Sequence, residues 1–550
     1  MRFALFPAAA ALLLIGCDRD DATAGDDAPT GGTLVIATAA DAGTLLPPLI
    51  ADVQGKQVSD QVFDGLAAIG TSINTVGDEG FTPRLAERWE WAGDSLSIVF
   101  HIDPDARWHD GAPVRASDVR FSHQVYTDPR VASPHAAVMS NIDSISVRDS
   151  LTAVAWFKRR TPEQFFEVTH QLQIIPEHLL KDTPRNALGT SAFARNPVGS
   201  GRFRFVRWVP GATIEVIADT ANYRGRPNLD RVIWSVAPDP TAAATKLFAG
   251  EADFYEALRR EHLPDIQKNP QLRTMRYPQL AYAFVGFNTR YPLFANRELR
   301  RALTMAVDRK RIVQSVFDSL ALPALGPFGR ALSTADTTIP QIPYDTARAK
   351  AILDSLGWRD TNGDSIRERG GQPLRFELLV PSTSSFRVRM SVLLQQELKN
   401  VGVDMKIDQV DIQTMTERQD AGRVQANFGA WNMDASPGGV RQTFTSAGAT
   451  PGGYNYGQYR SPVFDALVDS AMSAMDPSRS RDYFRRAYAT IIQDAPAIFM
   501  YELQGMAGVH RRLNITGVRP DAWWAEISEW TIPADQRIDR DRIGLRTAPN

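Results

Sequence analysis

The chain has 550 residues, of which 61 are Lys or Arg and 63 are Asp or Glu, so its formal net charge is −2. Its 43% hydrophobic and 23% charged residues are typical of a soluble globular protein. The length exceeds what one hydrophobic core supports, which predicts two or three domains. The balanced charge excludes a general basic field of the kind that attracts nucleic acid.

The N-terminus carries an export signal. An apolar run over residues 3–15 follows Arg2. It is too short to span a bilayer, so residues 1–16 are predicted to be a signal peptide. The run ends in Leu-Ile-Gly-Cys, which resembles the bacterial lipobox, so Cys17 is predicted to carry a lipid. The alternative is an ordinary signal peptide followed by an incidental cysteine.

Cys17 is the only cysteine, which excludes an intramolecular disulfide and thiolate metal clusters. Residues 17–32 are rich in small and acidic residues and are predicted to form a flexible tether behind the lipid. No later segment has 18 uncharged apolar residues in a row, so the remaining chain is not expected to span a membrane. Together these features place the folded body outside the cytoplasm.

The predicted elements begin with a β-branched strand at 33–37 and a helix at 58–66. Alternating apolar residues at 96–100 predict a strand with one buried face. A helix is expected at 117–126 and a longer one at 299–316. The second half of the chain alternates further helices (346–356, 388–401 and 479–493) with strands (374–380 and 403–410). This alternation predicts an α/β lobe.

No enzyme signature is present. The sequence lacks the G-x-x-x-x-G-K-[ST] phosphate loop, the H-E-x-x-H metal motif and the G-x-S-x-G nucleophile elbow. The eight histidines are scattered, and His109-Asp110 is better interpreted as part of a turn than as a catalytic pair. We therefore expect neither enzymatic activity nor a cofactor.

One acidic segment, residues 360–368, resembles the start of a calcium-binding loop, because oxygen-bearing side chains recur at alternate positions. These residues are Asp360, Asn362 and Asp364, with Glu368 further along. However, Ser365 replaces the usual glycine, and Gly371 occupies the place of the final glutamate. The sequence therefore favours a solvated hairpin between residues 358 and 374, and it assigns no metal.

Four groups of short blocks, spread over roughly 450 residues, give the chain a family resemblance. They are PRLAERWE (83–90) with RWHDGAP (107–113), NPVGSG (196–201) with NYRGRPNLDR (222–231), GFNT (286–289) with RRAL (300–303) and AVDR (306–309), and GW (357–358) with PVFD (462–465). In this order and spacing the chain resembles the bacterial extracellular solute-binding proteins of family 5, which include dipeptide-, oligopeptide- and nickel-binding members.

The resemblance implies an α/β, two-lobed periplasmic-binding-protein type II fold with an extra domain inserted in the first lobe. The expected segments are lobe I in three parts (33–76, 206–286 and 506–550), the inserted domain (77–205) and lobe II (287–505). A ligand would bind in the cleft between the lobes.

The resemblance also points to ligand-binding residues. Trp431 and Asp434 match the W-x-x-D of peptide-binding members, in which the Asp pairs with the ligand α-ammonium and the Trp lies along the ligand. The alternative is that Asp434 only caps the turn at 436–439. Some oligopeptide binders place an Arg before this Trp to meet the ligand carboxylate. That Arg is missing here, and Arg387 and Arg441 remain open as substitutes.

Two further sets of residues are candidates for ligand contact. Tyr454, Asn455 and Tyr456 lie in a glycine-rich loop and are candidates for the rim of the cleft, with simple turn structure as the alternative. Asn288 ends a predicted strand where the chain passes to the second lobe. It could contact the ligand, but a role in the hinge is favoured.

The predicted function is capture of short peptides, with closure of the lobes by hinge motion and delivery to the permease subunits of an ABC importer. The protein is expected to be a monomer held at a bacterial membrane by its lipid, in the periplasm or at the cell surface, without nucleic acid. Alternatives are a non-peptide ligand (metal chelate, oligosaccharide or opine) in the same fold, and a peptide-sensing or chaperone-like lipoprotein.

Overall fold

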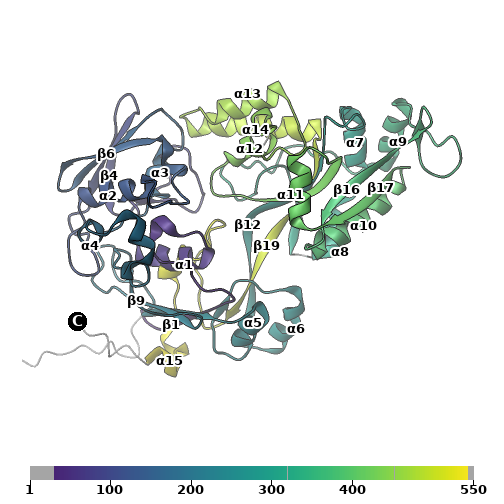
Figure 1. Cartoon of the computed structure of the whole chain (residues 1–550). Helices are drawn as coiled ribbons and strands as arrows, with labels where there is room; N and C mark the ends of the chain where they lie inside the picture. Colours follow the sequence, from purple (N-terminus) through teal and green to yellow (C-terminus); the bar gives the residue numbers. More distant parts are fainter. Residues whose placement is uncertain (1–29, 319, 451–452, 543–550) are drawn as a thin grey trace, which may run out of the picture.

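The computed structural model describes residues 30–318, 320–450 and 453–542. The predicted signal peptide, Cys17 and most of the tether lie outside these residues. Two lobes are joined at the centre of the molecule by a pair of long strands, and a smaller domain packs on the first lobe (Figure 1). The predicted two-lobed α/β architecture is thereby confirmed. Within the described residues, none of the helices combines the length and apolar character needed to cross a bilayer.

One sheet of eleven strands runs through both lobes. In spatial order its strands are β17 (Asp404–Val410), β16 (Arg375–Pro381), β18 (Ala426–Asn432), β12 (Leu272–Phe287), β19 (Ala497–His510), β11 (Phe254–Tyr255), β1 (Thr33–Thr38), β10 (Arg231–Val236), β9 (Thr213–Ala218) and β8 (Phe203–Val209), with β13 (Ala321–Pro323) beside β19. The strands from β17 to β18 belong to lobe II, and those from β11 to β8 belong to lobe I.

Strands β12 and β19 are shared by the two lobes. In lobe I they pair with each other from Leu272↔His510 to Pro278↔Gln504, and in lobe II β12 also pairs with β18. The register between β12 and β19 shifts between Pro278 and Tyr282. The chain therefore passes between the lobes inside these strands, and the boundary at 286 stays a prediction.

Helices cover both faces of the lobe II part of the sheet, as the alternating pattern predicted. They are α7 (Arg297–Met305), α8 (Arg309–Phe317), α9 (Thr346–Ser355), α10 (Ser385–Lys399), α11 (Ile412–Asp420), α12 (Gly439–Phe444), α13 (Pro462–Ala471) and α14 (Pro477–Asp494). The single helix predicted at 299–316 is two helices, because the Asp308 side chain accepts the amide of Arg311 and starts α8 afresh.

Lobe I carries the helices α1 (Val53–Val62), α5 (Pro240–Phe248), α6 (Leu263–Lys268) and α15 (Asp539–Arg542). Helix α1 begins five residues before the predicted start of that helix, because the Asp52 side chain accepts the amide of Gly55 at 2.7 Å and caps it. Two short strands, β2 (Ala67–Ala68) and β3 (Thr82–Pro83), pair at the border with the inserted domain.

The inserted domain has its own antiparallel sheet, packed with helices against the core of lobe I. Its elements are β4 (Ala86–Trp91), β5 (Ser97–Ile102), α2 (Ala116–Thr127), β6 (Ile142–Asp149), β7 (Thr152–Phe157), α3 (Gln164–Thr169) and α4 (Glu177–Leu180). The NPVGSG block returns the chain to lobe I. A Cβ atom at Gly199 would lie 1.9 Å from the carbonyl oxygen of Val62, so only glycine fits there.

A buried ion-pair network ties together the ends of lobe I. The Arg512 guanidinium binds Asp253 at 2.7 Å and Asp541 at 2.6 Å, and it donates to the carbonyl oxygen of Thr33 at 3.0 Å. The two carboxylates accept the amides of Val35 and Thr33 in turn. Strand β1, the end of β19 and helix α15 thus share one charged centre that is 3% exposed or less.

Replacing Arg512 with methionine is expected to lower the free energy of unfolding by about 3–5 kcal/mol, because it leaves the buried Asp541 without its cation and the buried Asp253 with Arg540 alone. Urea denaturation followed by circular dichroism measures this change. The control is Arg485→Met, which removes an exposed pair with Asp482 and should cost about 1 kcal/mol or less. Equal losses in the two variants would contradict the stabilising role of the network.

Candidate functional site

Two adjoining cavities lie between the lobes. The larger, here called the main cavity, has a volume of about 1560 Å³. Its floor is formed by β12 and β19 at Gln279–Ala281 and Leu503–Met506, and its walls come from both lobes. Sites for drug-sized ligands measure about 300–1,000 Å³, so the main cavity can accept a longer or bulkier guest.

The smaller cavity, here called the Asp434 cavity, has a volume of about 550 Å³. Three predicted site residues, Trp431, Asp434 and Tyr454, line it, together with Glu163 of the inserted domain. Asn432 and Met433 line both cavities, so the two spaces meet at the end of β18.

Strand pairing fixes the position of Trp431 and Asp434. Trp431 pairs with Tyr282 of β12, and the amide of Met433 donates to the carbonyl oxygen of Leu280 at 2.7 Å. The chain then leaves the sheet, and Asp434 Oδ1 accepts the amide of Ser436 at 2.9 Å. The turn-capping role weighed from the sequence is therefore present, and it uses only Oδ1. Oδ2 can accept from a second partner.

The predicted aromatic residues come together. The ring of Trp431 lies 5.6 Å from that of Tyr454, edge to face, and stacks with Tyr456 at 6.1 Å. Tyr454 is 48% exposed and faces the Asp434 cavity. Tyr454 stands edge-on to both other rings, and Trp431 and Tyr454 form an apolar wall beside the Asp434 carboxylate, which suits a ligand with an apolar body and a charged end.

Asn455 and Asn288 bind the protein's own backbone. The Asn455 amide group donates to the carbonyl oxygens of Thr445 and Tyr459, both at 2.9 Å, and its side chain is buried. Asn288 donates to Val424 at 2.8 Å inside lobe II. Neither lines the main cavity or the Asp434 cavity. Their ligand contact stays a prediction without support from this geometry, and Asn288 lies beyond the crossing at 278–282.

Two carboxylates share the Asp434 cavity. Glu163 accepts from the hydroxyls of Thr75 at 2.5 Å and Ser436 at 2.8 Å, which links the inserted domain to lobe II. Burial raises the pKa of Glu163, and the charge of Asp434 raises it further. Asp434 is open to solvent, but the surrounding walls displace part of its hydration and raise its pKa. A cationic guest would relieve the repulsion between these two groups.

Of the two arginines considered for binding a ligand carboxylate, one lines a cavity and the other does not. Arg441 lines the Asp434 cavity, with its Nε 3.3 Å from Asp469. Arg387 donates to the carbonyl oxygen of Phe428 and lines neither cavity. Arg389 does line the main cavity, and sequence reasoning missed it. Residues two apart on a helix face different directions, so the sequence of α10 does not show which arginine reaches the cleft.

Other wall residues were also missed. Trp523 and Trp524 of lobe I line the main cavity, and the Trp523 ring nitrogen donates to Glu256. Gln57 binds the same carboxylate at 2.9 Å. The pair of adjacent tryptophans near the C-terminus could have suggested a binding surface. However, nothing in the sequence shows that they line the same cavity as α10.

Comparison with known proteins identifies the family. The sequence model for bacterial extracellular solute-binding proteins, family 5 middle, matches residues 80–451, which is more than half of the chain. The chain belongs to this family. Its members are substrate-binding proteins of ABC importers and not enzymes, which confirms the expected absence of enzymatic activity.

Oligopeptide-binding protein AppA of Bacillus subtilis is a similar curated relative. It is 28% identical over 428 residues, which is 76% of this chain and 77% of AppA. The structure of AppA in complex with a nonapeptide matches with a TM-score of 0.67 at 25% identity, covering 92% of this chain and 99% of AppA.

Two further structures share the fold. HbpA2 of Haemophilus parasuis matches with a TM-score of 0.79 at 23% identity and covers 91% of this chain and 99% of its own. NikZ of Campylobacter jejuni, in complex with Ni(L-His), matches with a TM-score of 0.69 at 23% identity, and the match covers 91% of this chain and 99% of NikZ. These likenesses confirm the type II two-lobed fold. The bound molecules differ, so the fold alone does not determine the ligand.

The floor of the main cavity depends on a glycine. A Cβ atom at Gly505 would lie 2.2 Å from the ring of Tyr277, its partner across β12 and β19. We expect Gly505→Ala to push this ring toward the cavity and to lower the free energy of unfolding by about 1–3 kcal/mol. Gly439→Ala is the control, because a Cβ atom there meets nothing within 4 Å. Urea titrations of both variants measure this change. A free energy of unfolding in Gly505→Ala equal to that of wild type would contradict the tight contact.

Proposed function

We propose that the protein captures short peptides in the two interlobe cavities and delivers them to the permease of an ABC importer, while a lipid on Cys17 holds it at the membrane. The observation that carries the peptide assignment is the Asp434 cavity. There Trp431 and Asp434 stand beside a second carboxylate, and the cavity opens into a space large enough for several residues.

In this proposal the peptide α-ammonium binds Asp434 through Oδ2, with Glu163 adding negative charge from the inserted domain. A charged amine that enters a closed cleft loses water and needs a fixed opposite charge. Trp431 and Tyr454 provide an apolar wall that accepts different side chains. The site would therefore select for a free N-terminus and tolerate many sequences.

The rest of the peptide would extend past Asn432 and Met433 into the main cavity. Arg389 on α10, and Arg259 and Arg260 on the lobe I side, are the cations on its walls. Any of these can meet the C-terminal carboxylate of a longer peptide, whereas Arg441 is the nearest choice for a dipeptide in the Asp434 cavity. Ligand length would decide which cation is used.

Binding would couple to closure of the lobes. Because β12 and β19 belong to both lobes, a bend at residues 278–282 moves lobe II against lobe I without breaking either half of the sheet. The closed form would dock on the permease. No bond of the ligand is made or broken.

A second candidate is a non-peptide ligand such as a metal chelate, an oligosaccharide or an opine. The solved relative that holds Ni(L-His) shows that a protein of this fold can bind such a compound. Native mass spectrometry of material purified without denaturation identifies the bound molecule and separates the candidates. A peptide-sensing or chaperone-like lipoprotein would bind peptides without a partner permease.

Replacing Asp434 with asparagine is expected to weaken binding of free-amine peptides by about 10- to 100-fold, because the amine loses its charged partner. Calorimetry with a library of dipeptides to pentapeptides measures the change. Peptides acetylated at the N-terminus should bind wild type and variant alike. Asp482→Asn on the exposed face of α14 is the control. Equal affinity of Asp434→Asn and wild type would remove the amine role, and no binding of any peptide would overturn the peptide proposal.

Peptide affinity is expected to depend on pH through Asp434. Its pKa is raised, so the carboxyl gains a proton at a higher pH than an ordinary aspartate and loses its attraction for the ammonium there. Affinity should therefore decline as the pH falls from 7, earlier than an ordinary aspartate pKa of about 3.9 predicts. Calorimetry between pH 4 and 7 tests this. In Asp434→Asn the acidic decline should be much smaller, and an identical decline would assign it to another group.

A further inference from the structure

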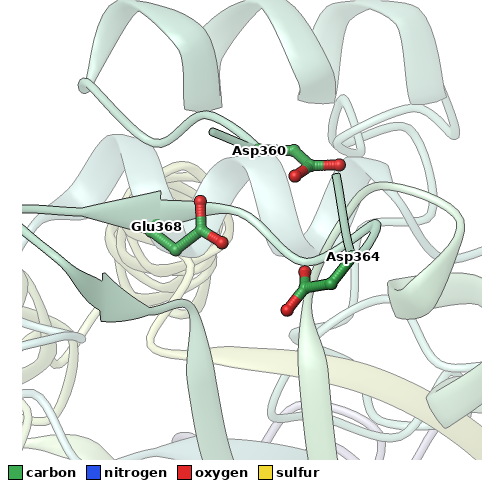
Figure 2. A group of neighbouring side chains, drawn as sticks. All are labelled: Asp360, Asp364 and Glu368. Carbon is green, nitrogen blue, oxygen red and sulfur yellow. The ribbon is translucent and has the colours of Figure 1, made fainter. Parts of the chain in front are cut away.

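An acidic loop in lobe II, outside both cavities, has features that the proposed function does not use. It lies between α9 and β16, and it ends in a hairpin of β14 (Glu368–Arg369) and β15 (Gln372–Pro373). The hairpin expected from the sequence is therefore confirmed. The carboxylates of Asp360, Asp364 and Glu368 each place an oxygen within 4.8 Å of the others. Figure 2 shows the three groups around a common space.

Glu368 distinguishes this loop from an ordinary acidic surface. Its side chain is 9% exposed, and its Oε1 has no hydrogen-bond partner among the described residues. Its Oε2 accepts from the amide of Thr361 at 2.9 Å and from the hydroxyl of Thr361 at 3.0 Å. A buried carboxylate oxygen without a donor is costly, so a ligand that fills this place would stabilise the loop.

The neighbouring cations are engaged elsewhere. Arg367 pairs with Asp354 at 2.6 Å and donates to the carbonyl oxygens of Trp358 and Val401. Arg369 lies over the ring of Trp358. Across residues 30–318, 320–450 and 453–542, no ion pair reaches any of the three carboxylates. Three negative charges thus converge without a protein cation.

Backbone amides of the loop donate hydrogen bonds to two of these carboxylates and fix their positions. Asp360 accepts the amides of Gly363 at 2.7 Å and Ser365 at 3.0 Å, and Asp364 accepts that of Ile366 at 2.8 Å. Ser365 has a φ of 70°, so it adopts the left-handed turn that glycine supplies in calcium loops. In the sequence, serine in place of that glycine argued against a metal. In the structure, Ser365 still makes the turn.

We propose that this loop binds one calcium ion through the carboxylates of Asp360, Asp364 and Glu368, with Asn362 and water completing the shell. These residues match positions 1, 3, 5 and 9 of a calcium loop. An all-oxygen, three-carboxylate set in an irregular loop suits Ca²⁺, whereas Mg²⁺ requires a near-ideal octahedron and zinc prefers nitrogen and sulfur. The ion joins the two ends of the loop and fastens the hairpin to lobe II.

The expected affinity is that of an extracellular module, with a Kd of about 10⁻⁴–10⁻³ M, because the loop lacks the bidentate glutamate at position 12. The purified full chain, stripped with EGTA, is titrated with CaCl₂ by calorimetry and by thermal unfolding. At about ten times the Kd, Ca²⁺ should raise the Tm of a chain of this length by about 1 °C. MgCl₂, and KCl at matched ionic strength, should raise it by less than half as much.

Two variants make the test specific. Asp360→Asn changes an exposed residue and Glu368→Gln the buried one, and each should fold and lose at least ten-fold in Ca²⁺ affinity. Asp482→Asn, on an exposed helix of the same lobe, is the matched control and should respond as wild type does. Absence of a Ca²⁺ response in wild type, or a response in Asp360→Asn and Glu368→Gln as large as that of wild type, would overturn the proposal. Because peptide binding is measured separately, this result does not depend on the peptide proposal.

Discussion

The structure depends on two strands that both lobes share. Strands β12 and β19 pair with each other through lobe I and continue into lobe II, where β18 joins β12. Their ladder carries hydrogen bonds on both sides of the cleft, so the lobes cannot slide past each other without breaking it. The register of this ladder shifts between Pro278 and Tyr282, and the residues between them form part of the floor of the main cavity. The same short segment therefore lies in the passage between the lobes and at the base of the cavity.

The charges of the cleft are arranged unevenly. Asp434 of lobe II and Glu163 of the inserted domain line the smaller cavity with Arg441, whereas the larger cavity is lined by both arginines and carboxylates (Arg259, Arg260, Arg389, Glu256, Glu261 and Asp521). Both carboxyl pKa values are raised, because the surrounding walls displace water from the two groups and the charge of Asp434 acts on Glu163.

Much of the fold and part of the site could be predicted from the sequence. Strand alternation and helical periodicity gave most elements of lobe II, and the short blocks gave the two-lobed family fold. Trp431 was assigned through the family resemblance and Tyr454 and Tyr456 through their glycine-rich loop, whereas the contact between these rings was not predicted. The break at Asp308 was missed because one side-chain cap interrupts an otherwise continuous helical pattern. The positions of Glu163, Arg389 and Trp523 depend on packing between distant segments, which periodicity does not show.

The Arg512 network fixes the place where the described chain enters lobe I. The Thr33 carbonyl and amide are held by Arg512 and Asp541, and β1 pairs with β10 along its whole length. The first strand of lobe I is therefore bound to the end of β19 and to α15 as well as to its neighbours in the sheet, so it cannot separate from the lobe without exposing buried charges.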